Sequence, residues 1–181
     1  MRLTRLLLLA LPALAATPAL SPAAQKPMSD RARSNMERQI RHELVMLPYY
    51  GVFDNLLFRV EGGTVVLRGA VTRPTLKSDA EAVVKRVEGV EKVRNEIRVL
   101  PASPNDDRIR LAAFRAIYSH ASLNRYALRA VPPIHILVEN GNLTLEGVVA
   151  NDMDKQVAYS QARGVPGVFS VTNNLRVEGA K

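Results

Sequence analysis

The sequence contains few side chains whose spacing could support metal binding. Asp152 and Asp154 alternate as in a calcium loop, but an EF-hand loop that began at Asp152 would end on Arg163 instead of a glutamate. A zinc-type site needs at least three converging ligands. The three histidines lie far apart and show neither HxH nor HExxH spacing: His42, His120 and His135. We therefore predict no metal site and no bound cofactor.

Nucleophilic catalysis has equally little support in the sequence. Ser119 precedes His120, but no nucleophile elbow and no orienting acid accompany the pair. The chain has no cysteine, which excludes a thiol nucleophile, a thiolate metal site, a disulfide framework and a lipidated N-terminal cysteine. We predict that the protein is not an enzyme and has no small-molecule substrate.

The N-terminus is typical of a secretory signal peptide. Two arginines precede an apolar run over residues 6–16, and a stretch of small residues and prolines follows. The run is shorter than the roughly 20 apolar residues that a membrane span needs, and Pro12 interrupts it. We predict a signal peptide over residues 1–24, with cleavage after Ala15 or after Ala24, and an exported, periplasmic chain that can be peripheral on a membrane.

The rest of the sequence is a duplication. Residues 58–99 align without gaps on residues 136–177, at a shift of 78 positions, and 15 of these 42 positions are identical. A short segment with two prolines and a serine separates the copies and is typical of a turn. We predict two domains, over residues 30–100 and 106–178, joined by a linker over residues 101–105.

Each copy has the pattern of an αββαβ unit. A capping-box pattern from Ser34 to Glu37 predicts the start of the first helix. A Gly-Gly turn in the first copy and an Asn-Gly turn in the second predict a β-hairpin in each. A second helix follows, with Asn151 as its N-cap in the later copy, and then a third strand. The glycines expected to be structural are Gly63, Gly69, Gly89, Gly141, Gly147 and Gly167.

The predicted fold class is therefore α+β. Two tandem αββαβ domains each have a small mixed three-stranded sheet with two helices on one face, and the other sheet face is polar. Domains of this size are only marginally stable alone, so packing of the two copies against each other would stabilise both.

A motif present in both copies resembles the BON domain (bacterial OsmY and nodulation). It reads Val-Glu-x-Gly-x-apolar-x-Leu-x-Gly-x-Val over residues 60–71 and 138–149, and a Val-x-Gly-Val pattern follows the second helix. The layout is similar to the osmotically inducible periplasmic protein Y type. The resemblance implies a non-catalytic module that associates with phospholipid or the cell envelope and supports outer-membrane integrity and tolerance of osmotic stress. The second copy departs from the pattern through a longer segment over residues 120–133.

The strongest candidate for a binding surface is a basic and apolar region of the second copy. Between residues 108 and 138 there are five arginines and no acidic residue. The helix at its start is apolar around most of its circumference, so the face that does not pack on the sheet needs another partner. Arginines beside aromatic side chains suit an anionic lipid interface. The candidate lipid or partner surface comprises Arg108, Arg110, Leu111, Phe114, Arg115, Tyr118, Arg125 and Arg129.

These residues also have a second interpretation, in which Leu111, Phe114 and Tyr118 form the contact between the two domains. A secondary candidate surface is the open sheet face of the first copy, where outward arginines are opposed only by Glu96: Arg59, Arg68, Arg94 and Arg98. The apolar segment over residues 49–53 is expected to cover the core, and the alternative is an exposed apolar loop.

The sequence thus predicts an exported, non-catalytic module that docks on anionic phospholipid through residues 108–129. The alternative is a protein-interaction or scaffold module of the cell envelope, which would bind an envelope protein or a second copy with the same surface. Nucleic acid is not an expected partner. Gly164 and Gly167 form a GxxG, but a KH-type GxxG loop lies between two helices, whereas this one joins a helix to a strand.

Overall fold

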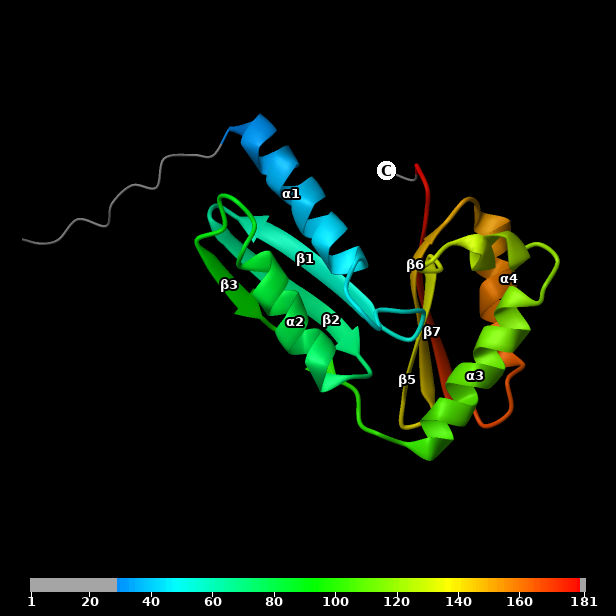
Figure 1. The fold of residues 1–181 in the computed structure, drawn as a ribbon. Coiled ribbons are helices and arrows are strands. Elements are labelled where there is room, and N and C mark those ends of the chain that lie inside the picture. Colours follow the sequence, from blue (N-terminus) through cyan, green and yellow to red (C-terminus); the bar gives the residue numbers. More distant parts are fainter. Residues whose placement is uncertain (1–28, 180–181) are drawn as a thin grey trace, which may run out of the picture.

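The computed structural model describes residues 29–179, and these residues form two α+β domains of the same architecture (Figure 1). The predicted signal peptide over residues 1–24 lies outside the described residues. Domain 1 consists of α1 (Asp30–Val45), β1 (Asn55–Glu61), β2 (Thr64–Val71), α2 (Pro74–Val84), β3 (Lys92–Asn95) and β4 (Arg98–Val99). Domain 2 consists of α3 (Pro104–Tyr118), the 3₁₀ helix η1 (Asn124–Leu128), β5 (Ile134–Glu139), β6 (Asn142–Val149), α4 (Asp152–Arg163) and β7 (Ser170–Val177). The predicted α+β fold with tandem αββαβ domains is confirmed.

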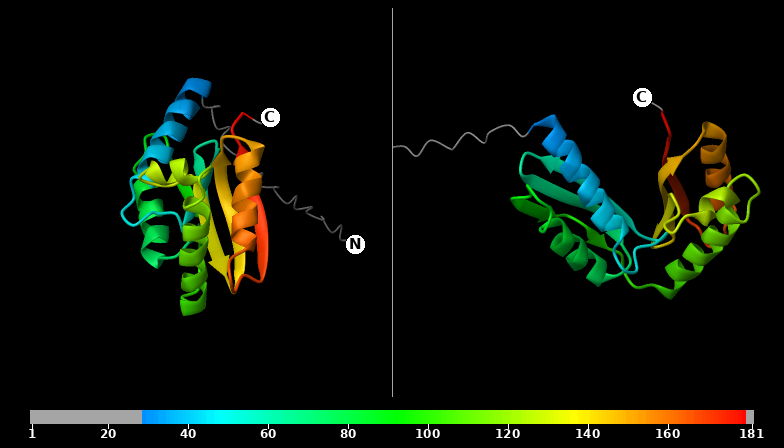
Figure 2. Two further views of the ribbon diagram at one scale, coloured as in Figure 1. Left: turned by 90° about the vertical axis from the view of Figure 1, so that its right-hand side faces the viewer. Right: turned by 45° about the horizontal axis from the view of Figure 1, so that its top comes forward.

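The strand pairing repeats between the domains. β1 and β2 form an antiparallel hairpin in which Val60 pairs with Val65, and in the hairpin of β5 and β6 Val138 pairs with Leu143. These two pairs are related by the 78-residue shift of the sequence repeat. In each domain the last strand lies parallel to the second, because a helix connects them. The two helices of each domain cover one face of its sheet (Figures 1 and 2).

The last strand is continuous in domain 2 and divided in domain 1. β7 pairs with β6 over its full length, whereas the corresponding segment of domain 1 is split at Glu96 and Ile97 into β3 and β4. Leu67 pairs with Asn95 and Ala70 with Arg98, so the offset of 28 residues is the same on both sides of the break. The division therefore leaves the register of the sheet unchanged.

The hairpin turns differ between the copies. In domain 2, Asn140 and Gly141 have φ values of 54° and 77°, as predicted for a tight primed turn. In domain 1 only Gly62 is in this region, at 61°, and Gly63 is not. A Cβ added at Gly63 would lie 2.5 Å from the exposed Glu91 side chain, which can move aside, so this glycine is less constrained than Gly62. The other predicted structural glycines all have positive φ: Gly69, Gly89, Gly141, Gly147 and Gly167.

The first helix begins earlier than predicted. Helix α1 starts at Asp30 and not at the capping-box pattern of Ser34, because Ser29 is the N-cap and its hydroxyl accepts the Ala32 amide at 3.3 Å. Glu37 forms an ion pair with an arginine one turn earlier instead of closing a capping box.

The start of α3 was also predicted too late. Pro104 lies within the predicted linker but forms the first turn of α3, where a proline fits because no amide donor is needed there. Ser103 caps this helix. The predicted N-cap of α4 is confirmed, since the Asn151 side chain accepts the Asp154 amide at 2.8 Å.

Each domain has its own hydrophobic core between sheet and helices. The predicted stripe of the first helix is buried in domain 1: Met36, Ile40, Leu44 and Leu47. The matching core of domain 2 contains the side chains of α3 and β5 that point inward: Ile109, Ala113, Ile117, Ile134, Ile136 and Val138. Because the two cores are separate, other residues must join the domains.

Candidate functional site

Helix α3 divides the predicted lipid or partner surface between solvent and core. Arg108, Leu111 and Arg115 are exposed and lie on one face of the helix, because they are three and four positions apart. Leu111 is 48% exposed, which is high for a large apolar side chain between two cations. These three residues form what we call the α3 stripe. Among residues 29–179 neither arginine of the stripe pairs with a carboxylate.

Arg110 and Tyr118, which were predicted to belong to the surface, are buried instead. The Arg110 side chain extends from α3 to β5, where its guanidinium donates to the Val138 carbonyl oxygen at 2.6 Å. It also pairs with Asp107. The Tyr118 hydroxyl donates to the Ile134 carbonyl at 2.6 Å, and burial raises the pKa of this phenol. Both side chains bond carbonyls of β5, so they hold α3 on its sheet and cannot contact a membrane.

Phe114 is half-buried and contacts domain 1. Its ring meets the Phe53 ring edge-on, with centroids 6.2 Å apart. Next to this contact, the Val52 carbonyl of domain 1 accepts the Ile136 amide of domain 2 at 2.8 Å. The segment over residues 49–53 therefore crosses from domain 1 to domain 2 (Figure 1). Part of this segment covers a core as expected, but the core that Val52 and Phe53 cover belongs to the other domain. For Phe114, the alternative interpretation as an interdomain contact is the one that the structure supports.

Asp54 fixes the shape of this crossing segment. Its carboxylate is buried and accepts hydrogen bonds from the Thr72 amide at 2.7 Å, the Thr72 hydroxyl at 2.9 Å and the Gly51 amide at 3.2 Å. With the segment held in this way, Tyr50 stacks on His135 of domain 2 at 5.8 Å between ring centroids. The sequence predicts an ordinary histidine at position 135, because nothing in the sequence places Tyr50 against it.

We expect the stability of the protein to fall as the pH drops below the ordinary histidine pKa of 6.5. Burial lowers the pKa of His135, against a smaller opposing effect of the Asp54 carboxylate and of the Gly51 and Asp54 carbonyls. The unfolded chain then binds a proton that the folded chain resists. Urea midpoints of wild type at pH 7.5 and pH 5.5 should therefore differ more than those of His135→Gln. His42→Gln, at an exposed histidine, should behave as wild type.

The longer segment of domain 2 is anchored by a buried carboxylate. Asp154 accepts hydrogen bonds from the hydroxyl of Tyr126, at 2.6 Å, and from Arg125. The Tyr126 oxygen in turn accepts the Ala150 amide at 2.8 Å. Arg125 of the predicted surface is therefore partly neutralised, whereas Arg129, just after η1, is exposed and pairs with no carboxylate among the described residues.

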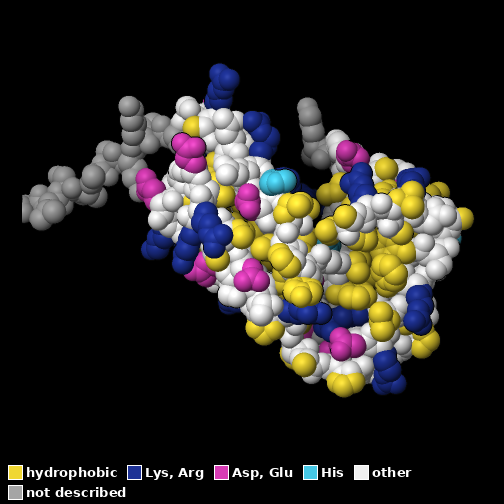
Figure 3. Space-filling view, in the orientation of Figure 1, with side chains coloured by type: hydrophobic (Ala, Val, Ile, Leu, Met, Phe, Trp, Pro, Cys, Tyr) yellow, Lys and Arg dark blue, Asp and Glu magenta, His cyan; other side chains and the backbone are white. Residues whose placement is uncertain are grey.

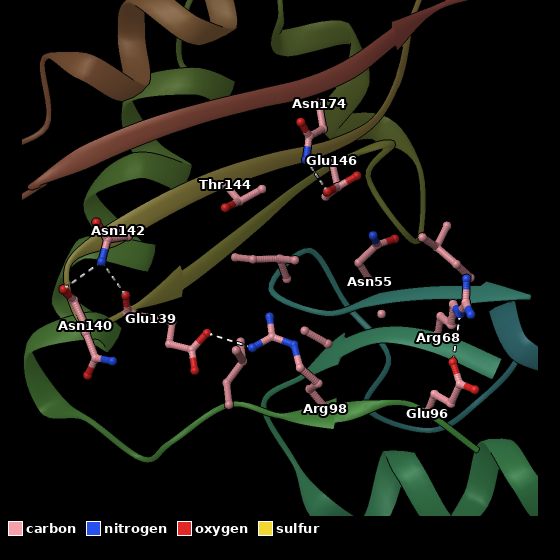
Figure 4. A pocket seen from close by; sticks show the side chains of 15 residues that line it. Asn55, Arg68, Glu96, Arg98, Glu139, Asn140, Asn142, Thr144, Glu146 and Asn174 are labelled. Carbon is pink, nitrogen blue, oxygen red and sulfur yellow. Dashed lines mark hydrogen bonds and ion pairs between the residues drawn. The ribbon is translucent and has the colours of Figure 1, made fainter. Parts of the chain in front are cut away.

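The open faces of the two sheets meet across a polar cleft of about 650 Å³ (Figure 4). Arg98 of β4 spans this cleft and pairs with Glu139 of β5 at 2.9 Å. Arg68 pairs with Glu96 at 2.8 Å within domain 1. The arginine-rich sheet face of domain 1 was a secondary candidate surface, but its charges are compensated. Its other two arginines, Arg59 and Arg94, pair with Glu61 and Glu96.

A second hollow lies between α1 and β1 of domain 1 and the segment before β5 together with β6 and β7 of domain 2. Its volume is about 550 Å³, and we call it the interdomain groove. In Figure 3 the surface is hollowed between the two domains, with hydrophobic side chains on both sides. Three arginines border the groove: Arg41, Arg129 and Arg176. Of these, only Arg129 was a predicted site residue. The one signal for Arg176 was its identity with Arg98 in the repeat.

The two domains are tandem αββαβ units whose open sheet faces line the polar cleft. The sequence profile of the BON domain matches residues 34–101 and residues 119–179. The chain therefore belongs to the BON domain family. BON domains are associated with membrane and envelope proteins, and the family is non-catalytic. Within residues 29–179 no helix is long and apolar enough to cross a membrane.

Comparison with curated proteins gives no match. Among solved structures, the chain is similar to CdsD, a structural protein of the type III secretion system of Chlamydia trachomatis. The identity is 14% and the TM-score 0.32, over 81% of this chain and 94% of that chain. A structure of the C-terminal domain of CdsD gives 16% identity and a TM-score of 0.27, over 77% of this chain and 96% of that chain. Scores at this level carry no implication for function.

Proposed function

We propose that this protein is a peripheral module of the cell envelope that docks on anionic phospholipid and thereby supports envelope integrity under stress. The observation that carries the proposal is the α3 stripe, in which Arg108 and Arg115 flank the exposed Leu111. The cations suit lipid phosphates, and the apolar side chain between them suits the boundary of the acyl region. The family's association with the envelope agrees with this role.

The contribution of the stripe is moderate and depends on salt. Each arginine near an anionic membrane surface contributes about 1 kcal/mol, and this attraction decays within a Debye length of about 8 Å at physiological salt. Docking through the stripe is therefore reversible. Arg129 is also exposed, so it adds to the attraction in any orientation of the protein that brings Arg129 near the membrane surface.

Flotation of the protein over residues 25–181 with vesicles tests the proposal. We expect flotation with phosphatidylglycerol vesicles, weaker flotation at higher salt, and none with phosphatidylcholine vesicles. The double variant Arg108→Gln/Arg115→Gln should lower vesicle partitioning about 30-fold, which corresponds to about 2 kcal/mol. Leu111→Asn should weaken it further.

A matched control removes the same charge from domain 1. Arg31 and Arg38 are exposed on α1, so Arg31→Gln/Arg38→Gln should partition like wild type. Equal losses in both double variants would show that net charge, and not the stripe, drives docking. Absence of flotation under every condition would contradict lipid docking and favour the alternative role as a protein-interaction module.

A further inference from the structure

The interdomain groove combines apolar walls with a cationic rim. Three of its lining side chains are large, apolar and well exposed: Val45 at 48%, Leu57 at 46% and Val148 at 36%. Val45 and Leu57 come from domain 1 and Val148 from domain 2, so the walls face each other across the domain boundary. Exposed apolar groups gathered in a hollow are typical of a site that an apolar ligand covers.

The rim is made of arginines from three separate elements. Arg41 lies on α1, Arg129 precedes β5, and Arg176 lies on β7. None of the three pairs with a carboxylate among residues 29–179, in contrast to the arginines of the polar cleft. Arg41 is positioned by the Phe58 ring, 5.7 Å below its guanidinium carbon. The rim is therefore a concentration of uncompensated positive charge.

Two carboxylates line hollows next to the groove, and neither forms an ion pair with an arginine of the rim. Glu37 lies in the hollow that continues along β1, but it is paired with Arg33 at 3.0 Å. Glu178 lies in a neighbouring hollow beside Arg125 and Arg129. Of the residues that the structure describes, no acidic one lines the groove itself.

We propose that the interdomain groove binds one single-chain anionic lipid, with its phosphate on the arginine rim and its acyl chain along the apolar walls. The volume of about 550 Å³ lies within the range of about 300–1,000 Å³ that is usual for ligand sites, which often occur between domains. Guanidinium groups bind phosphate through charge-assisted hydrogen bonds. This site is separate from the α3 stripe, and its occupation does not require docking on a membrane.

Calorimetric titration with dodecyl phosphate, kept below its aggregation concentration, tests this proposal on the protein over residues 25–181. We expect one molecule to bind per chain. Butyl phosphate has the head group without the chain, and dodecylphosphocholine has the chain without the net charge. Each should bind at least about tenfold more weakly than dodecyl phosphate, because butyl phosphate cannot fill the apolar walls and dodecylphosphocholine has no net charge for the arginine rim.

Two variants probe the two halves of the groove. Arg41→Gln/Arg176→Gln removes exposed cations of the rim, so it should fold normally and weaken dodecyl phosphate binding about tenfold or more. Val148→Glu places a carboxylate on the apolar wall and should abolish binding. The stripe variant Arg108→Gln/Arg115→Gln is the matched control and should bind dodecyl phosphate like wild type.

The outcomes separate the groove from the stripe. Loss of titration in the rim variant with unchanged vesicle flotation would establish the groove independently of membrane docking. Equal affinity for dodecyl phosphate and dodecylphosphocholine, or a rim variant that binds like wild type, would overturn the proposal. Amide chemical-shift changes that map to α3 instead of Gly147 and Val148 would also overturn it.

Discussion

The Gly147→Ala variant is expected to lose roughly 3 kcal/mol or more of unfolding free energy, measured by urea denaturation. Gly147 has a φ of 120°, a backbone conformation that residues with a Cβ rarely adopt. An added Cβ would also lie only 1.9 Å from the Pro133 carbonyl oxygen. That oxygen accepts the Val148 amide at 3.2 Å, so it cannot move away without losing a hydrogen bond.

The repeat provides a second copy of this experiment and a control. Gly69 occupies the equivalent position of domain 1, with a φ of 112° and a Cβ position 2.0 Å from the Asn55 carbonyl oxygen, so Gly69→Ala should be similarly destabilised. Gly164 has an ordinary φ, and its nearest neighbour would be 3.6 Å away. If Gly147→Ala were as stable as Gly164→Ala, the close approach of the two strands would not be essential.

The sequence predicted the parts of this fold that depend on local pattern. The 78-residue repeat implied that both hairpins share one register, and the pairs of Val60 with Val65 and Val138 with Leu143 show that they do. Helix starts were less well predicted, because a serine can cap a helix only where the chain direction allows it. Ser29 and Ser103 act as caps, whereas Ser34, which begins the capping-box pattern, lies inside α1.

The candidate surface was harder to predict, because a helical wheel places Cβ atoms and not the ends of long side chains. Arg110 points its guanidinium toward β5 although the sequence around it suggests a basic surface. The interdomain groove is formed by residues of both domains, so it exists only once the domains are packed. That packing includes the contacts of Tyr50 and Phe53 with domain 2, and neither the sequence repeat nor the hydrophobic periodicity predicts these contacts.

Charge reversal at Arg110 is expected to destabilise domain 2 by about 3–5 kcal/mol, because it would bury a carboxylate that has no cationic partner. The side chain of Arg110 is only 4% exposed, and its guanidinium satisfies the Val138 carbonyl. Arg110→Glu would leave this carbonyl without its donor and bring a third carboxylate close to Asp106 and Asp107 at the start of α3. Faster amide hydrogen exchange in β5 and β6, together with a lower thermal unfolding midpoint, would show this loss of stability in domain 2.

The repeat again provides the control, since the two copies make the same bond in different surroundings. Arg33 donates to the Val60 carbonyl at 3.2 Å, and Val60 corresponds to Val138 in the repeat. The Arg33 side chain is 52% exposed, so water can replace it, and Arg33→Glu should cost less than about 1 kcal/mol. Equal effects of the two reversals would show that the bond to the strand, and not burial, sets the cost. A large effect confined to Arg110→Glu would mean that one arginine of the predicted surface is part of the core, and that lipid docking must be tested at Arg108 and Arg115 instead.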